Sequence, residues 1–512
     1  MSASREKKLR QDQTASGYVD PKAEKELEEK KAEKRSNVLY SVIAVLFVLV
    51  VAASFLWRSN VISRNATALT IDGEKYSAAE VNFYYQNVYR GFLQSNSYFI
   101  SYLGLDTNAS LKSQTVNATA ASMMGVEEGS SWHDYIMDNT VKQMTMIQRG
   151  LKQAQEEGYQ FPASVQEQYE DSLNSLKTSA ESTGMSVKAY LQRNLGAIMT
   201  EKVYNQQVLR MLQYQAYAQS YSDSLTYTDA ELEAAYQADP KAYDKAAWEY
   251  VVVSGAADST TDADGNTVQP TETAKATAEE ILAAYNSGKS LESIAGNYEK
   301  ATYYNTTDAT YYDGVVGNWL FDDARKDGDT EILEVGTSYY VSLFHSRGRE
   351  EYKTVDIRHI LITPETGTKA QGDEGYEDEQ TQLKAAARTK AEEILAQWKS
   401  GEATEDSFAQ LALENSADGS KYDGGLYTRV TKGWAVEEFN DWCFDASRKD
   451  GDTGIVDTTY GSHVMYFVGY DLPAWAASVT SDLQEKAASE WSTALSENAD
   501  VQQSDFGMKF VG

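Results

Sequence analysis

Residues 441–455 read DWCFDASRKDGDTGI, and residues 318–332 read NWLFDDARKDGDTEI. Both segments have a short apolar run that ends in phenylalanine, and both continue into the same Arg-Lys-Asp-Gly-Asp-Thr stretch. A second matched pair lies upstream, where AEEILA occurs at residues 278–283 and again at 391–396. Two matched pairs in the same order indicate an internal repeat.

The order of predicted elements is the same in both copies. WEYVVVS (248–254) and IRHILIT (357–363) are apolar runs of strand length, and each precedes its AEEILA helix. A second helix, a loop, a short helix, a turn and a final strand then follow. We therefore expect an α+β protein with two β-α-β repeats, over residues 240–346 and 352–471.

The segment before the repeats is predicted to be helical. Residues 79–222 contain long runs of Gln, Ala, Leu, Met and Tyr, with aromatic and leucine residues at helical spacing. An Asp72-Gly73 turn follows a short strand, and Ser77 and Thr228 are candidate helix caps. The apolar stripe is read either as an ordinary helical core or as a cradle for unfolded polypeptides.

One stretch near the N-terminus has the composition of a membrane span. Val38–Trp57 contains twenty residues without a charge, about 30 Å as a helix, which matches the hydrocarbon core of a bilayer. Lys30, Lys31, Lys34 and Arg35 precede it, so residues 1–36 are expected in the cytoplasm and the remainder outside. A cleaved signal peptide is the competing interpretation.

These patterns divide the chain into six predicted segments. They are a cytoplasmic charged tail over 1–36, a transmembrane signal-anchor over 38–57, a helical domain over 66–235, the first repeat over 240–346, the second repeat over 352–471, and a C-terminal helix over 472–512.

Composition excludes several functional classes. The chain has 512 residues and a net charge of −31, and an acidic surface of this kind repels nucleic acid. The single cysteine, Cys443, excludes an internal disulfide framework, and we expect it to be an inert core thiol. With four histidines in all, a metal site is not expected, and no cofactor is predicted.

The second repeat carries a distinctive set of residues. His359-Ile360-Leu361-Ile362 opens its first strand, and SFAQLALENSADGSKYDGGLY (407–427) covers the second helix and the following loop. Phe439 precedes the repeated DWCF, and TTYGSH (458–463) opens the last strand. In combination these motifs resemble the parvulin family of peptidyl-prolyl isomerases. The whole layout resembles PrsA-like and SurA-like extracytoplasmic chaperones, which join a helical module to one or two parvulin domains.

The reaction that this resemblance implies needs no nucleophile, metal or cofactor. Rotation about a peptide bond is opposed by about 18–20 kcal/mol of resonance, and X-Pro bonds exchange isomers within tens of seconds. A catalyst must hold the proline ring in an apolar pocket and favour the twisted bond with fixed polar groups.

The resemblance assigns roles to eight residues. Asp418 is placed beside the substrate carbonyl, His359 and His463 form a paired-histidine network, and Thr458 supports that network. The residues implied for the proline pocket are Leu426, Ala435, Phe439 and Phe444.

The sequence departs from the family pattern in two places, and a further loop bears on the substrate. The family usually has a long apolar residue where this chain has Ala435, so Trp434 is a candidate substitute. The glycine loop is reduced to Gly424-Gly425-Leu426-Tyr427 and lacks its acid. The loop over 365–380 is acidic, which argues against the phosphopeptide preference of members that carry a basic cluster there.

The first repeat lacks the histidines, because Tyr250 aligns with His359 and Tyr340 with His463. We therefore expect it to be non-catalytic and to serve in spacing or client binding. The resulting hypothesis is a membrane-anchored extracytoplasmic foldase that acts on newly exported polypeptides containing X-Pro bonds. A holdase that uses both repeats as binding modules is the main alternative, and an envelope scaffold is a third.

Overall fold

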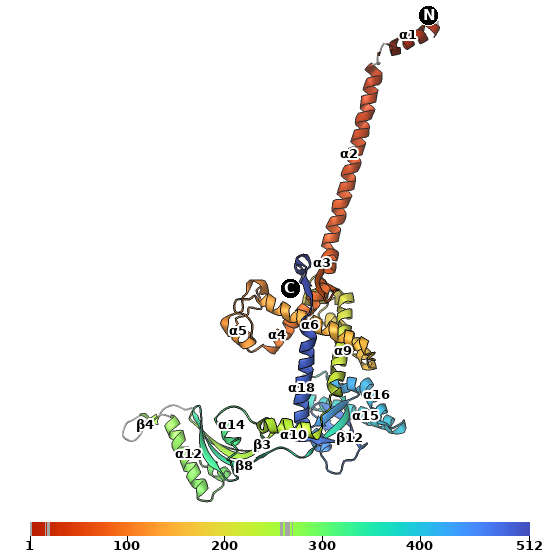
Figure 1. Ribbon diagram of the computed structural model, residues 1–512. Helices are drawn as coiled ribbons and strands as arrows, with labels where there is room; N and C mark the ends of the chain where they lie inside the picture. The colour runs from red at the N-terminus through yellow and green to blue at the C-terminus, as the bar shows by residue number, and fades with distance from the viewer. Residues whose placement is uncertain (1–2, 16, 18–20, 256–259, 262–266, 269) are drawn as a thin grey trace. The chain divides into compact units, whose positions relative to one another are not determined.

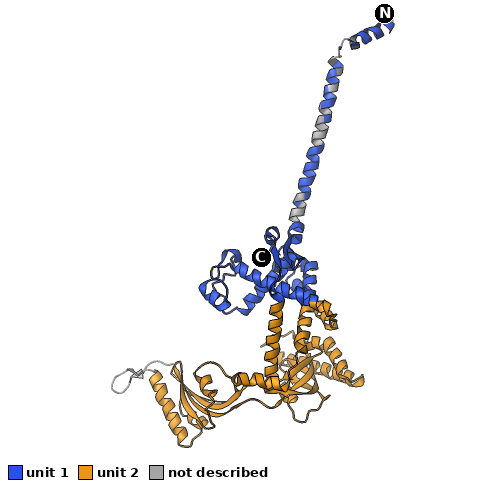
Figure 2. Cartoon of the chain, in the orientation of Figure 1, with its two compact units in different colours: residues 1–152, 171–211, 495–512 blue, residues 153–170, 212–494 orange. Residues whose placement is uncertain are grey.

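The computed structural model describes residues 3–15, 17, 21–255, 260–261, 267–268 and 270–512. The chain divides into two compact units, which Figure 2 shows in different colours. Unit 1 comprises residues 1–152, 171–211 and 495–512, and unit 2 comprises residues 153–170 and 212–494. The predicted helical segment 66–235 is therefore shared between both units, because α6, α7 and α9 each cross a boundary.

Unit 1 is mainly helical. Its elements, including the helices that it shares with unit 2, are α1 (Ala3–Ala15), α2 (Pro21–Arg58), α3 (Val61–Asn65), β1 (Thr67–Ile71), β2 (Glu74–Ser77), α4 (Ala78–Ser95), η1 (Leu111–Ser113), α5 (Ala118–Met124), α6 (Trp132–Glu156), α7 (Ala163–Ser182), α8 (Val187–Leu195), α9 (Glu201–Ser224), β13 (Val501–Gln503) and α19 (Asp505–Met508).

A small hairpin begins the folded part of unit 1, as the sequence predicts. Asp72 and Gly73 both have positive φ and form a tight turn between β1 and β2. Ser77 then caps α4 in a reciprocal capping box with Glu80. β13, from the end of the chain, pairs with the free edge of β1 and completes a three-stranded sheet.

The predicted membrane span falls within α2, and part of it lies outside the description. Nothing is described of the side chains of residues 36–40, 53 and 55–58. Among the side chains that are described, none of the helices has an apolar stretch sufficient to traverse a bilayer. The predicted single transmembrane helix is therefore not supported.

Unit 2 contains two mixed helix-and-sheet repeats (Figure 1). Its elements are α10 (Asp229–Ala238), α11 (Pro240–Tyr243), β3 (Lys245–Ser254), β4 (Thr260–Thr261), β5 (Thr267–Val268), α12 (Pro270–Asn286), α13 (Leu291–Ala295), β6 (Ala301–Ala309), α14 (Val315–Leu320), β7 (Thr330–Val335), β8 (Ser338–Gly348), β9 (Lys353–Ile362), α15 (Tyr376–Ser400), α16 (Glu405–Asn415), η2 (Gly419–Asp423), β10 (Leu426–Val430), α17 (Glu437–Cys443), β11 (Thr453–Thr458), β12 (Gly461–Pro473) and α18 (Ala474–Ser496), which ends in unit 1.

The two repeats have the same sheet topology. The strand order is β6-β3-β8-β7 in the first and β10-β9-β12-β11 in the second. Tyr340 and His463 each stand two residues after the start of the final strand, β8 or β12. Tyr250 and His359 each oppose the residue two positions further along that strand. The register therefore places the tyrosine pair where the histidine pair stands.

Each face of the second sheet has its own core. The first face packs Ile360 and Val464 against α15 and α16, with Phe408 fully buried between them. The second face packs Ile357 and Met465 against α17. His359 and His463 have the same strand parity as the second set, so the histidines lie at one end of the α17 face.

Candidate active site

His359 and His463 meet on neighbouring strands of the second sheet. β9 and β12 are antiparallel, and the two residues occupy diagonal positions on one face. Their Nδ1 atoms are 3.0 Å apart, and the rings are nearly parallel with centroids 5.2 Å apart. Both side chains are buried. The pair that the sequence predicts is therefore assembled by strand register alone.

A continuous hydrogen-bond chain passes through both imidazoles. Asp418 Oδ1 lies 3.3 Å from His359 Nε2, and Thr458 Oγ1 lies 2.9 Å from His463 Nε2. A carboxylate can only accept, so His359 donates from Nε2. Of the two facing Nδ1 atoms one donates and the other accepts, and the Thr458 hydroxyl can pair with Nε2 of His463 in either role. Every ring nitrogen therefore has a hydrogen-bond partner.

Asp418 is the centre of a second set of hydrogen bonds. It caps η2 by accepting from the backbone N–H of Ser420 at 2.8 Å and from its hydroxyl at 2.5 Å. The hydroxyl of Tyr427 donates to the same carboxyl oxygen at 2.9 Å. The hydrogen bond from His359, together with those from Ser420, holds the pKa of Asp418 well below its usual range despite partial burial. The carboxyl is therefore ionised.

His463 is held in its neutral form. Burial disfavours the imidazolium, and the neighbouring His359 disfavours it further, so the pKa of His463 falls to about 4. A neutral imidazole at this position can accept from Thr458 and donate to His359 at once. His463 is consequently neutral at physiological pH.

An aromatic wall adjoins the histidines. Phe439 is only 3% exposed and meets the rings of His359 and His463 edge-on, with centroids 5.5 and 5.3 Å away. The ring centroid of Tyr427 lies 5.3 Å from that of His359, and the ring centroid of Trp434 lies 4.7 Å from that of Tyr427. The indole of Trp434 is half exposed. The site thus joins an apolar surface to an anion and a rigid polar network.

Comparisons with known proteins identify this part of the chain. Residues 341–468 match the family model described as a PPIC-type PPIase domain. The chain is 29% identical over 142 residues to foldase protein PrsA 1 of Listeria innocua. That match covers 27% of this chain and 39% of the relative. This chain carries a parvulin-type isomerase domain.

Solved structures of PrsA proteins are also similar to the chain. PrsA from Bacillus subtilis is 14% identical, with a TM-score of 0.27, and the match covers 75% of this chain and 93% of that one. PrsA from Bacillus anthracis is 21% identical, with a TM-score of 0.18, and the match covers 29% and 58%. The predicted resemblance of the second repeat to the parvulin family is confirmed by the family model.

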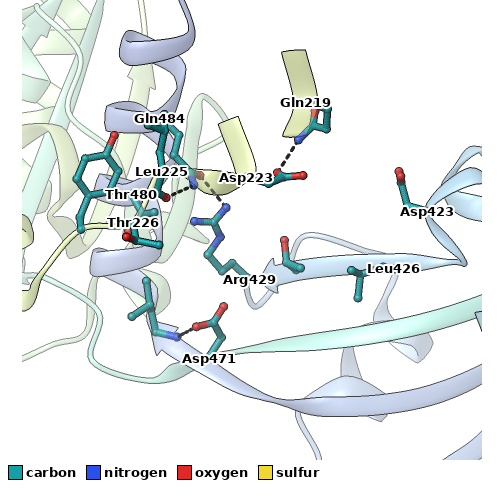
Figure 3. A pocket seen from close by; sticks show the side chains of 13 residues that line it. Gln219, Asp223, Leu225, Thr226, Asp423, Leu426, Arg429, Asp471, Thr480 and Gln484 are labelled. Atoms are coloured by element: carbon teal, nitrogen blue, oxygen red, sulfur yellow. Dashed lines mark hydrogen bonds between the residues drawn. The ribbon is translucent and has the colours of Figure 1, made fainter. Parts of the chain in front are cut away.

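Two predicted pocket residues are not beside the histidines of the parvulin domain. Leu426 lines a separate pocket (Figure 3), because alternate residues of β10 point to opposite faces of the sheet. Tyr427 therefore takes the position expected for Leu426. Phe444 packs against the same α17 core but meets Tyr352, with ring centroids 6.0 Å apart.

Ala435 and Cys443 both belong to the core beside α17. Ala435 is partly buried against the α17 core, and the neighbouring Trp434 adjoins Phe439, with centroids 6.3 Å apart. Trp434 thus extends the aromatic wall beside the small Ala435. Cys443 is fully buried, and burial raises the pKa of its thiol to about 12, as expected for an inert core residue.

The glycine loop lets β10 approach the histidine strand. Gly425 has a φ of +75°, and a Cβ there would lie 2.3 Å from the carbonyl oxygen of His359. The backbone N–H of His359 in turn donates to the carbonyl of Gly425. Only glycine fits this position without displacing the strand, so the shortened loop still closes against the parvulin site.

Aromatic rings replace the network in the first repeat. Tyr250 stacks on Trp248, Tyr304 and Tyr340, with ring planes within 17° of parallel. Burial raises the pKa of Tyr250, which keeps its hydroxyl protonated. A phenol offers one oxygen where imidazole offers two nitrogens on opposite sides of a ring. The first repeat therefore cannot form the same hydrogen-bond chain.

Sequence analysis missed two members of the site. Ser420 bonds both Asp418 and His359, and Tyr427 bonds Asp418. The signal for Ser420 was available, because Asp-Gly-Ser is an Asx-type capping pattern in which the aspartate accepts from the residue two positions on. Tyr427 depended on which face of β10 it occupies, which the sequence alone did not reveal.

Proposed function

We propose that the chain is an extracytoplasmic foldase whose parvulin domain isomerises X-Pro bonds in exported polypeptides. The carrying observation is the hydrogen-bond chain from Asp418 through both histidines to Thr458, with Phe439 packed across it. The proline ring would lie against the aromatic wall. The ionised carboxylate would then act on the adjoining carbonyl as the bond twists and its resonance is lost.

The direct test is exchange of an Ala-Pro peptide, followed by NMR with the full chain. We expect acceleration by the native protein. Asp418→Asn should lower the rate about tenfold or more, because it removes the charge but keeps an oxygen that can cap η2. Asp418→Ala should lower the rate and also destabilise the domain by about 1–2 kcal/mol through the lost cap. A folded native chain without activity would favour the holdase instead.

We further propose that unit 1 binds unfolded clients. Tyr98, Phe99 and Tyr102 are largely exposed apolar side chains within one short segment of this unit, and such groupings commonly mark binding surfaces. Replacing all three by serine should weaken suppression of client aggregation while leaving isomerisation of a short Ala-Pro peptide intact. A matched triple change at exposed polar positions, Ser97, Ser101 and Asn108 to alanine, is the control. Equal suppression by both variants would contradict this proposal.

The proposed location rests on the uncharged run over 38–57 and the basic residues before it. Export through this run is proposed, whether it is retained or cleaved. Protease added to spheroplasts should digest the parvulin domain, and the mass of the exported chain should report cleavage. Complete protection in intact spheroplasts, with digestion after lysis, would place the domain inside the cell.

A further inference from the structure

A pocket of unit 2 adjoins the parvulin domain and lies apart from the hydrogen-bond network of the active site. Its volume is about 610 Å³, and its walls come from the end of α9, the following segment, β10 and α18 (Figure 3). The lining residues that bear on its chemistry are Asp223, Leu225, Asp423, Leu426, Arg429 and Asp471.

Carboxylates outnumber cations in the lining of this pocket. Within the described part of the chain, Asp223, Asp423 and Asp471 form no ion pair. Asp223 accepts a hydrogen bond from Gln219, and Asp471 accepts one from the backbone N–H of Leu472. Arg429 is held by Gln484, whose Oε1 accepts from the guanidinium at 2.9 Å. The pocket therefore has an excess of negative charge.

Asp223 and Asp423 repel each other. Burial raises the pKa of Asp423, and the nearby charge of Asp223 raises it further. Asp223 comes from α9 and Asp423 from the end of η2, so two separate elements direct acids at one space. The charge of Arg358 offsets these effects only in part, so a cation bound between the two acids would relieve the remaining repulsion.

Two elements, η2 and β10, contribute residues to both the active site and the pocket. η2 begins after Asp418 at the network and ends at Asp423 in the pocket. On β10, Tyr427 faces the histidines and Leu426 faces the pocket. Five residues of a 3₁₀ helix rise roughly 10 Å, which about three extended residues span. A client with its proline at Phe439 that passed over β10, the edge strand of this sheet, would bring a side chain about three residues away to the pocket.

We propose that this pocket is a specificity subsite that binds a lysine or arginine side chain of the client, about three residues from the isomerised proline. The inference rests on the proposed isomerase function and adds a substrate preference to it. Leu225 and Leu426 offer apolar contact to the methylene stem, and the three aspartates receive the cationic head. The acidic lining suits a cationic side chain and disfavours a glutamate at the same place.

The test uses the full chain and a series of peptides with one proline. Lysine, norleucine or glutamate is placed at each of the five positions on either side of the proline. We expect one position, about three residues away, at which lysine gives about five- to tenfold higher kcat/KM than norleucine, and glutamate gives less. The lysine advantage should shrink as salt is raised, because exposed charge pairs are screened.

Variants of the pocket test which carboxylates produce the lysine preference. Asp423→Asn and, on a separate element, Asp223→Asn should each bring the lysine-to-norleucine ratio toward one. Asp378→Asn, an equal charge change in the first turn of α15, should leave the ratio as in the native chain. Fluorescence anisotropy of the labelled lysine peptide measures binding without catalysis. Its affinity should fall in Asp423→Asn and in Asp223→Asn but not in Asp378→Asn.

The outcomes separate the two proposals. No isomerisation of any peptide would overturn the proposed function. Isomerisation with no lysine preference at any position, or a preference that both pocket variants retain, would overturn the subsite alone. A glutamate preference lost in Arg429→Gln would also overturn it, because it would make the pocket an anion site.

Discussion

Replacing Phe439 by alanine is expected to lower kcat/KM of the full chain for an Ala-Pro peptide by about 10- to 100-fold. Phe439 is the buried ring that meets both histidines edge-on, so its loss removes the apolar surface proposed to hold the proline ring. An apolar contact of this size contributes about 1.5–3 kcal/mol, which corresponds to that range of rates. The measurement is NMR exchange spectroscopy at equal protein concentration.

The first repeat supplies a matched control. Alignment of the repeated NWLF and DWCF segments places Val316 at the position of Phe439, and Val316 is equally buried. Val316→Ala should leave the rate unchanged, because the first repeat has tyrosines in place of the histidines. Phe439→Leu, which retains most of the apolar volume, should fall between native and alanine. Comparable losses from Val316→Ala and Phe439→Ala would show that both repeats contribute to catalysis.

Acidification from about pH 6.5 to 4 is expected to destabilise the second repeat by up to about 3 kcal/mol through His463. The pKa of His463 is lowered to about 4 in the folded chain, from an ordinary value of 6.5. Between these values the unfolded chain binds a proton that the folded chain does not. Stability is therefore complete above pH 6.5 and falls as the pH decreases toward 4.

A site-resolved measurement is needed because a chain of several domains unfolds in more than one step. Hydrogen exchange of peptides from β9 and β12 should accelerate between pH 7 and 4.5 beyond the intrinsic change in exchange rate. His463→Gln should flatten that dependence, since glutamine can still donate and accept but does not titrate. Peptides from β3 and β8 serve as an internal reference. An unchanged pH dependence in His463→Gln, or titration of His463 near 6.5 by NMR, would refute the assignment.

Much of the fold could be predicted because repeats and caps are local signals. The matched segments around residues 318–332 and 441–455 predicted two repeats, and the two sheets have the same strand order. Thr228 and Glu231 form the predicted capping box, since that motif needs only four consecutive residues. The division into units was less accessible, because α6, α7 and α9 pass from one unit to the other without a break in sequence pattern.

The resemblance to parvulins implied the histidine pair, Asp418 and Thr458, because each belongs to a short sequence motif that can be matched residue by residue. The position of Tyr427 in the aromatic wall was not predicted. Gly424 and Gly425 both have positive φ, and Arg429 adds a positive φ where the pairing of β10 with β9 shifts between Tyr427 and Val430. A shift of one residue exchanges the two faces of a strand.

The sequence by itself thus determined which strands carry the network and which repeat lacks it. The histidines, or the tyrosines that replace them, are present in the chain whatever its fold. The tertiary structure decided that Tyr427 faces the histidines and Leu426 faces a separate acidic pocket. It also brought Asp223 and Asp423 together from distant parts of the chain. Such placements depend on backbone register and long-range packing, which no short stretch of residues encodes.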